Sequence, residues 1–125
     1  MQENQLLIAS LKSDRIALQN NIQANLEKIQ RLRQSKNNIT HEQGELWAHK
    51  RLISEPELSS STWDGKHAAE FMNIRANIEQ SYTSINSQQV EDIFSDIEQK
   101  IAQLESMNNG YSNSIASINL RISQL

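Results

Sequence analysis

The histidines and their neighbouring carboxylates are the residues of this chain whose types and spacing could support metal chemistry. His41, Glu45 and His49 stand four residues apart, so they share one face of a helix. A helical zinc-protease motif needs a second histidine four residues after the first, and Glu45 occupies that position. Solvated polar side chains account for this row, and we expect no functional metal site.

Other catalytic constellations are missing from the sequence. The serines do not stand in a G-x-S-x-G context, and three glycines cannot build a phosphate-binding loop. The carboxylates of residues 91–98 have the spacing of a solvated helix face. Cysteine is absent, which removes thiolate nucleophiles and disulfides. We therefore predict a chain that is not an enzyme, with no catalytic residues and no cofactor.

Composition limits the class of protein further. The chain has 125 residues, of which 37% are apolar and 5% aromatic, so we expect a single domain without a large globular core. A net charge of −3 argues against nucleic-acid binding. The sequence has no apolar stretch long enough to span a membrane and no basic, apolar leader. These features predict a cytoplasmic location.

The spacing of apolar residues in the first half of the chain predicts one long helix over residues 2–53. A row of positions seven residues apart is apolar at all but one place: Leu11, Leu18, Asn25, Leu32, Ile39, Leu46 and Ile53. A companion row also contains polar residues: Ile8, Arg15, Ile22, Ile29 and Lys36. A seven-residue period indicates a helix that packs on another helix. Polar residues within such a seam weaken it and can specify register.

The first helix is expected to end where a proline interrupts the pattern. Pro56 disfavours helical geometry at Glu55, which makes Glu55 a boundary. Residues 54–61 then form a connector, and Ser61 or Thr62 can cap a second helix over residues 62–125.

The second half of the chain has the more regular apolar pattern. One row repeats every seven residues: Val90, Ile97, Leu104, Tyr111, Ile118 and Leu125. Its companion row is Phe94, Ile101, Asn108, Ile115 and Ile122. The phase slips over residues 85–90, which changes the winding or turns the upstream stripe towards a different neighbour. Residues 108–110 are a soft point, where we favour a continuous helix over a break at Asn109-Gly110.

These elements predict an all-α fold, a long antiparallel helical hairpin that resembles a coiled coil and forms one domain over residues 1–125. Residues 1–53 carry eight basic and five acidic residues, and residues 54–125 carry four and ten. The hairpin brings the basic stretch 28–36 within a turn or two of the acidic stretch 91–98.

A two-helix hairpin buries only one side of each stripe, so the second stripe needs a further helix from a second copy or from another protein. The residues predicted to bind that partner are Val90, Phe94, Ile97, Ile101, Leu104, Tyr111, Ile115, Ile118 and Ile122.

The tip of the predicted hairpin, at the start of the second helix, contains a tryptophan and a glycine two residues apart. In "STWDGKHAAEF", Trp63 can fit the groove between helix ends, and Gly65 permits a close backbone approach. Phe71 begins the second apolar stripe. Trp47, in "ELWAH", is interpreted as seam packing.

A central W-x-G between two helices resembles the WXG-type (ESX) proteins of type VII secretion. The longer string with a coiled-coil arm before it is most similar to the YwqH-like family of Gram-positive bacteria. Five residues carry this resemblance: Trp63, Gly65, Ala68, Ala69 and Phe71. It implies a hairpin partner or adaptor that binds the helical LXG region of a secreted toxin, alone or with another small helical protein. It also implies that export, where it occurs, uses no cleaved signal peptide.

The sequence departs from the usual secretion signal, Y-x-x-x-D/E. At that spacing Asn86 follows Tyr82 and Ile115 follows Tyr111, whereas Phe94 and Glu98 give F-x-x-x-E. That pair resembles a targeting variant and also fits an ordinary heptad. The alternative function is a self-associating structural coiled coil without a secretion role, which predicts a homo-oligomer.

Overall fold

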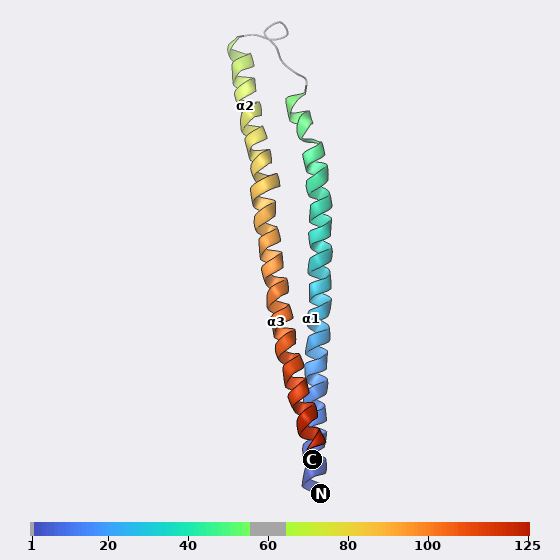
Figure 1. The fold of residues 1–125 in the computed structure, drawn as a ribbon. Coiled ribbons are helices and arrows are strands. Elements are labelled where there is room, and N and C mark those ends of the chain that lie inside the picture. Colours follow the sequence, from blue (N-terminus) through green and yellow to red (C-terminus); the bar gives the residue numbers. More distant parts are fainter. Residues whose placement is uncertain (1, 56–64) are drawn as a thin grey trace. The chain divides into compact units, whose positions relative to one another are not determined.

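The computed structural model describes residues 2–55 and 65–125, and the elements in these ranges are helices (Figure 1). The N-terminal arm consists of α1, Gln2–Ala48, and the 3₁₀ helix η1, Lys50–Ser54. The C-terminal arm consists of α2, Lys66–Thr83, the π-helix η2, Ser84–Gln89, and α3, Val90–Ser123. The fold is all-α, a helical hairpin of two arms, as the apolar pattern predicts.

The chain divides into two units, each built from both arms. Unit 1 contains Met1–Gln34 and Ile97–Leu125, and unit 2 contains Ser35–Asp96. Unit 1 thus pairs the first part of α1 with most of α3. Unit 2 contains the end of α1, the start of α3 and everything between them.

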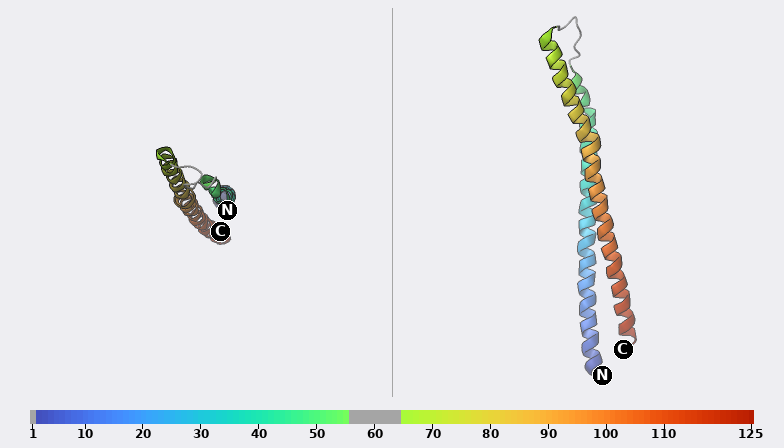
Figure 2. Two further views of the ribbon diagram at one scale, coloured as in Figure 1. Left: turned by 90° about the horizontal axis from the view of Figure 1, so that it is seen from above. Right: turned by 90° about the vertical axis from the view of Figure 1, so that its left-hand side faces the viewer.

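Unit 1 is held by a narrow apolar seam between antiparallel helices. Ile29 of α1 packs with Ile101 and Leu104 of α3, and Leu32 and Ile97 pack against this cluster. The two helices lie side by side in this unit (Figure 1 and Figure 2). Because these residues stand three, four or seven positions apart on their helices, the heptad spacing places them on one seam.

Two asparagines interrupt the seam of unit 1 and pair with each other. The Asn25 side chain donates through Nδ2 to Asn108 Oδ1 at 3.0 Å, and both residues are buried. Asn108 Nδ2 donates to the Ile22 carbonyl at 3.4 Å. A one-turn slip of either helix breaks these bonds and leaves buried amides unpaired, so the pair fixes the register.

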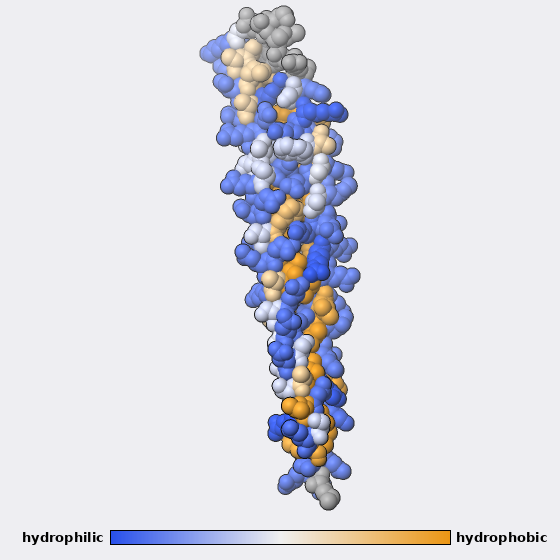
Figure 3. Space-filling model, in the orientation of Figure 1, coloured by the Kyte–Doolittle hydropathy of each residue, from blue (hydrophilic) through white to orange (hydrophobic). Residues whose placement is uncertain are grey.

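Burial in the hairpin is shallow. Leu11, Ile29, Ala68, Ile101 and Leu104 are the buried apolar residues in the described ranges, and none of them is completely enclosed. Apolar side chains remain visible over the lower part of the view in Figure 3, where unit 1 lies. Within residues 2–55 and 65–125, the helices are too short or too polar for any of them to cross a membrane.

The N-terminal arm changes geometry before its end. α-Helical geometry ends at Ala48, five residues before Ile53, the predicted last residue of the first helix. The tighter η1 turn then continues to Ser54. Glu55 is extended, with φ −103° and ψ 140°, which is the geometry that a following proline favours. The remaining connector residues, 56–61, and Thr62, the other candidate helix cap, lie outside the described ranges.

The π-helix η2 occupies the place where the apolar phase slips. A π turn contains more residues than an α turn, so it can take up an extra residue in a helix. In η2 the buried residue is Asn86, whereas Ile85 is exposed. Further along the chain, α3 runs through Asn109-Gly110 without a break.

Candidate protein-binding surface

The residues predicted to bind a partner lie on the side of α3 that the chain itself covers. Ile101 and Leu104 are buried in the seam of unit 1, and Ile97 packs against them. The other members of the predicted stripe are half-buried: Val90 and Phe94 in unit 2, and Tyr111, Ile115, Ile118 and Ile122 in unit 1. A partner helix can therefore reach the edges of this stripe, while its centre packs within the hairpin.

Apolar residues beside the seam extend this surface in unit 1. Leu6, Ile16 and Leu26 of α1 are exposed, as are Met107 and Leu120 of α3. A third helix packs on a pair of helices by entering the groove between them and contacting such flanking positions. Unit 1 thus offers apolar area to a further helix without opening its own seam.

Charged and polar contacts cross the seam of unit 1 at its solvent edge. Arg33 pairs with Glu105 at 2.8 Å, with both side chains at least half exposed. Arg15 Nη1 donates to Asn119 Oδ1 at 2.7 Å. The basic stretch 28–36 therefore forms this ion pair two turns beyond the acidic stretch 91–98. Exposed pairs of this kind contribute about 0–1 kcal/mol to the free energy of unfolding, so the apolar seam, and not these pairs, supplies most of the stability.

The two residues of the candidate targeting signal have different surroundings. Phe94 is half-buried, and Lys36 Nζ lies 5.6 Å from the centroid of its ring. Glu98 is exposed one turn further along α3. A receptor can thus reach the Glu98 carboxylate directly, whereas Phe94 also stabilises the hairpin.

Gly65 and Phe71 are the two site residues near the connector that the structure describes, and Trp63 lies outside the described ranges. Gly65 is the residue before α2 and has φ 101° and ψ −168°, a conformation that is essentially restricted to glycine. Among the described residues, no heavy atom lies within 4 Å of a Cβ built at this position. The structure therefore shows a backbone requirement at Gly65, while the close approach expected from the sequence is not formed within the described chain.

Phe71 belongs to an apolar face of α2 that points to solvent. We define the α2 face as Phe71, Ile74, Ile78 and Tyr82 of α2 together with Ile85 of η2. Phe71 is 39% exposed, Ile74 58%, Ile78 51% and Ile85 44%, and Tyr82 is half-buried. The last four residues line an open groove together with Asn77 and Ser81.

The side of α2 that faces inward in unit 2 is largely polar. Its covered residues are Ala68, Arg75, Glu79 and Asn86. Arg75 donates to the carbonyl oxygens of Ser54 and Glu55, and its guanidinium lies 4.8 Å from the centroid of the Phe71 ring. Ile74, Ile78 and Ile85 each stand one position before a covered residue, which turns them about 100° away from the covered side.

Polar groups at the junction of α2 and η2 are not fully paired. The Asn86 carbonyl accepts a bond from Gln43 Nε2 at 2.7 Å. In the part of the chain that the structure describes, Asn86 Oδ1 and the Tyr82 hydroxyl are buried without a hydrogen-bond partner. The phase slip in the sequence indicated an irregularity here, but it could not show that an asparagine becomes the buried residue.

Trp47 is exposed, which differs from its interpretation as seam packing. It lines an open groove with Thr40, Gln43 and Asn86, and Lys50 Nζ lies 4.6 Å from its ring centroid. The heptad row runs through Leu46, so the neighbouring Trp47 is turned away from the seam.

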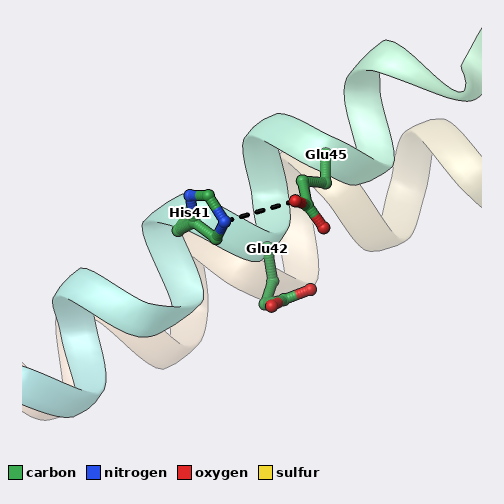
Figure 4. A group of neighbouring side chains, drawn as sticks. All are labelled: His41, Glu42 and Glu45. Atoms are coloured by element: carbon green, nitrogen blue, oxygen red, sulfur yellow. Dashed lines mark ion pairs between the residues drawn. The ribbon is translucent and has the colours of Figure 1, made fainter.

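The cluster of His41, Glu42 and Glu45 on α1 has the geometry of an ordinary helix surface (Figure 4). His41 Nε2 lies 3.2 Å from Glu45 Oε1, and His41, Glu42 and Glu45 are all exposed. His49 Nδ1 lies 2.8 Å from the Glu45 carbonyl oxygen, so His49 contacts the backbone at the end of the helix. Since all three residues of the cluster come from one exposed helix face, nothing positions them beyond the helix itself.

Comparison of the sequence with protein-family models shows the family of this helical hairpin. A family model described as YwqH-like matches residues 7–125, which include both arms and the connector. Comparison with curated proteins and with solved structures gives no match. Because the match extends over nearly the whole hairpin, the chain belongs to the YwqH-like family.

Proposed function

We propose that this protein is a non-catalytic helical partner that binds the helical LXG region of a type VII secreted toxin and assists its export. The observation that carries the proposal is the YwqH-like family match over both arms of the hairpin. The resemblance of the WXG-containing string to proteins of type VII secretion supports the same role.

The packing of unit 1 supports binding to another helix. Its seam buries few side chains completely, and apolar residues beside the seam stay exposed. A partner helix that covers these residues gains about 25 cal/mol for each Å² of apolar surface removed from water. The hairpin therefore supplies two sides of a helical bundle, and the toxin region supplies the rest.

Co-expression with the LXG region of the toxin encoded beside this gene tests the proposal. We expect the two chains to co-purify at a fixed ratio, and a chain that never co-purifies with such a region refutes the proposal. Leu120→Glu places a charge on the exposed apolar edge of unit 1 and should weaken this complex by at least tenfold. Ser112→Glu, at an exposed polar position of α3, is the matched control and should bind as the native chain does.

We also propose that the protein acts in the cytoplasm and that Phe94 and Glu98 contribute a targeting signal to the complex. Glu98→Ala tests this part, because Glu98 is an exposed carboxylate of α3. Toxin export should fall while toxin binding stays unchanged. Glu91→Ala, at another exposed carboxylate of α3, is the control. Equal export by both variants excludes the signal without affecting the binding proposal.

A further inference from the structure

The α2 face has a spacing that is the same in both directions along the helix. Ile74 and Tyr82 stand four residues before and after Ile78, and Phe71 and Ile85 stand seven residues before and after it. Positions four and seven residues apart lie on one side of a helix. If α2 is turned end over end about Ile78, each apolar position of the face therefore falls on another.

We propose that two copies of this chain associate through the α2 face as an antiparallel, two-fold symmetric pair centred on Ile78. A two-fold contact uses the same surface on both copies, which the symmetric spacing of the α2 face allows. Ile78 meets Ile78 of the second copy at the axis. Phe71 lies opposite Ile85 of the second copy, and Ile74 opposite Tyr82.

The α2 face is flanked by two rows of residues, and the row that lies farther from α1 permits this contact. Its residues are Glu70, Asn77, Ser81 and Gln88, and only Glu70 is charged. In an antiparallel pair the same sides of the two helices meet, so Glu70 lies near Gln88 of the second copy and Asn77 near Ser81. Like charges do not face each other there, and the amides and hydroxyls can exchange hydrogen bonds.

The other side of the α2 face carries one residue of each charge. Arg75 and Glu79 are half-buried, and they stand three residues before and one residue after Ile78. Arg75 keeps its bonds to the Ser54 and Glu55 carbonyls of its own chain, and antiparallel pairing brings the same guanidinium, which has five N–H donors, towards Glu79 of the other copy, twice across the interface. This charge complementarity favours a second copy of the chain, in antiparallel orientation, as the occupant of the α2 face.

The size of the α2 face indicates a weak, concentration-dependent dimer. Two faces of five side chains bury on the order of 1,000 Å² in total, which is the lower limit of specific interfaces. We therefore expect association in the micromolar range. Sedimentation over a concentration series of the isolated chain can detect this equilibrium.

Ile78→Glu tests the centre of the interface, because the symmetry places two carboxylates together at the axis. The dimer should weaken by at least about 100-fold. Ile93→Glu is the matched control, since Ile93 is similarly exposed on α3 and lies outside the α2 face; its dimer should weaken less than about threefold. Circular dichroism at 222 nm verifies that both variants are folded. A native chain that stays monomeric to millimolar concentration, or a dimer that Ile78→Glu leaves intact, overturns the proposal.

Single cysteines test the orientation directly, since the native sequence contains none. Under mild oxidation Ile78→Cys should form a disulfide-linked dimer. Phe71→Cys should not react with itself, because two copies of position 71 lie about 20 Å apart along an antiparallel pair. It should react when mixed with Ile85→Cys. Self-reaction of Phe71→Cys, or no reaction in the mixture, contradicts the antiparallel arrangement.

This inference concerns the isolated chain and does not depend on toxin binding. The Leu120→Glu variant changes α3 and should dimerise as the native chain does. Failure of the toxin to co-purify therefore leaves the dimer proposal unchanged, and a monomeric chain leaves the toxin proposal unchanged.

Discussion

At the scale of single residues, the hairpin depends on a few polar or conformational choices within a repetitive sequence. Asn25 and Asn108 satisfy each other in the seam, and Gly65 adopts a conformation that other residues avoid. The seam around them consists of interchangeable aliphatic residues. The residues that select a single register and a single turn geometry are therefore these asparagines and this glycine.

Removing one member of the asparagine pair should destabilise unit 1. Asn25→Leu leaves the Asn108 amide buried beside an apolar side chain, at a cost of about 1–3 kcal/mol in the free energy of unfolding. The double variant with Asn108→Leu should recover that loss, because no polar group then remains unpaired between these positions. Urea unfolding of the four proteins in a double-mutant cycle measures the coupling. Additive effects of the two changes contradict this view of the pair.

Replacing Gly65 tests the backbone requirement at the start of α2. Gly65→Ala forces a side chain into a positive-φ conformation and should cost about 1–3 kcal/mol, with nearly unchanged helix content. Gly110→Ala is the control, since Gly110 lies within α3, and it should stabilise the chain by roughly 0.5–1 kcal/mol. Thermal unfolding followed by circular dichroism compares them. Equal stabilisation by both changes shows that Gly65 is not constrained.

At the scale of elements, the C-terminal arm is three helical segments with different faces. α3 turns its apolar stripe towards α1 in unit 1, whereas α2 turns its apolar stripe to solvent in unit 2. The π-helix η2 lies between them and buries Asn86 where an apolar residue would fit the repeat. Because the apolar side changes direction along this arm, α3 packs within the hairpin, whereas α2 offers its apolar side to another molecule.

Deleting one exposed residue of η2 should convert it into a regular α-helix. Five α residues turn about as far as six π residues, so deleting Gln88 preserves the facing of α2 and removes the π turn. We expect a gain of about 1 kcal/mol, or a rise of roughly 4 °C in the unfolding midpoint. Deleting Gln103 from α3 is the control, since it rotates the following stripe by about 100° and should destabilise unit 1. A lower midpoint for the Gln88 deletion shows that the π turn is stabilising.

Much of this arrangement could be predicted from the sequence, because seven-residue periods directly encode a helix that packs on another helix. That reasoning gave the all-α hairpin and indicated that Asn25 could specify register. It could not give the facing of α2. The stripe from Phe71 to Ile85 predicts packing equally well against α1 or against another molecule. The exposure of its isoleucines and the contacts of Arg75 with Ser54 and Glu55 select between them. For the same reason Trp47 was wrongly placed in the seam.

At the scale of the whole molecule, burial is unequally divided between the two units. Six buried residues hold the seam of unit 1: Leu11, Asn25, Ile29, Ile101, Leu104 and Asn108. In the described part of unit 2, the buried residues are Ala68 and Asn86. Unit 2 therefore gains less from burial and should open more readily.

Hydrogen exchange should resolve this difference along the chain. Amides of α2 should exchange at least tenfold faster than those of α3 in Ile97–Leu125, because opening free energies follow the local density of buried contacts. Mass spectrometry of peptic peptides measures both regions in one experiment. Uniform protection along the two arms contradicts unequal burial as the determinant of stability.

The shallow burial also has a consequence for how long the protein survives in a cell. Since no side chain in the described ranges is fully enclosed, any molecule that covers the hairpin stabilises it by mass action. Copies without such a cover open more often and expose themselves to proteases. We therefore expect degradation to remove the excess copies, so that the abundance of the protein follows the supply of the molecule that binds it.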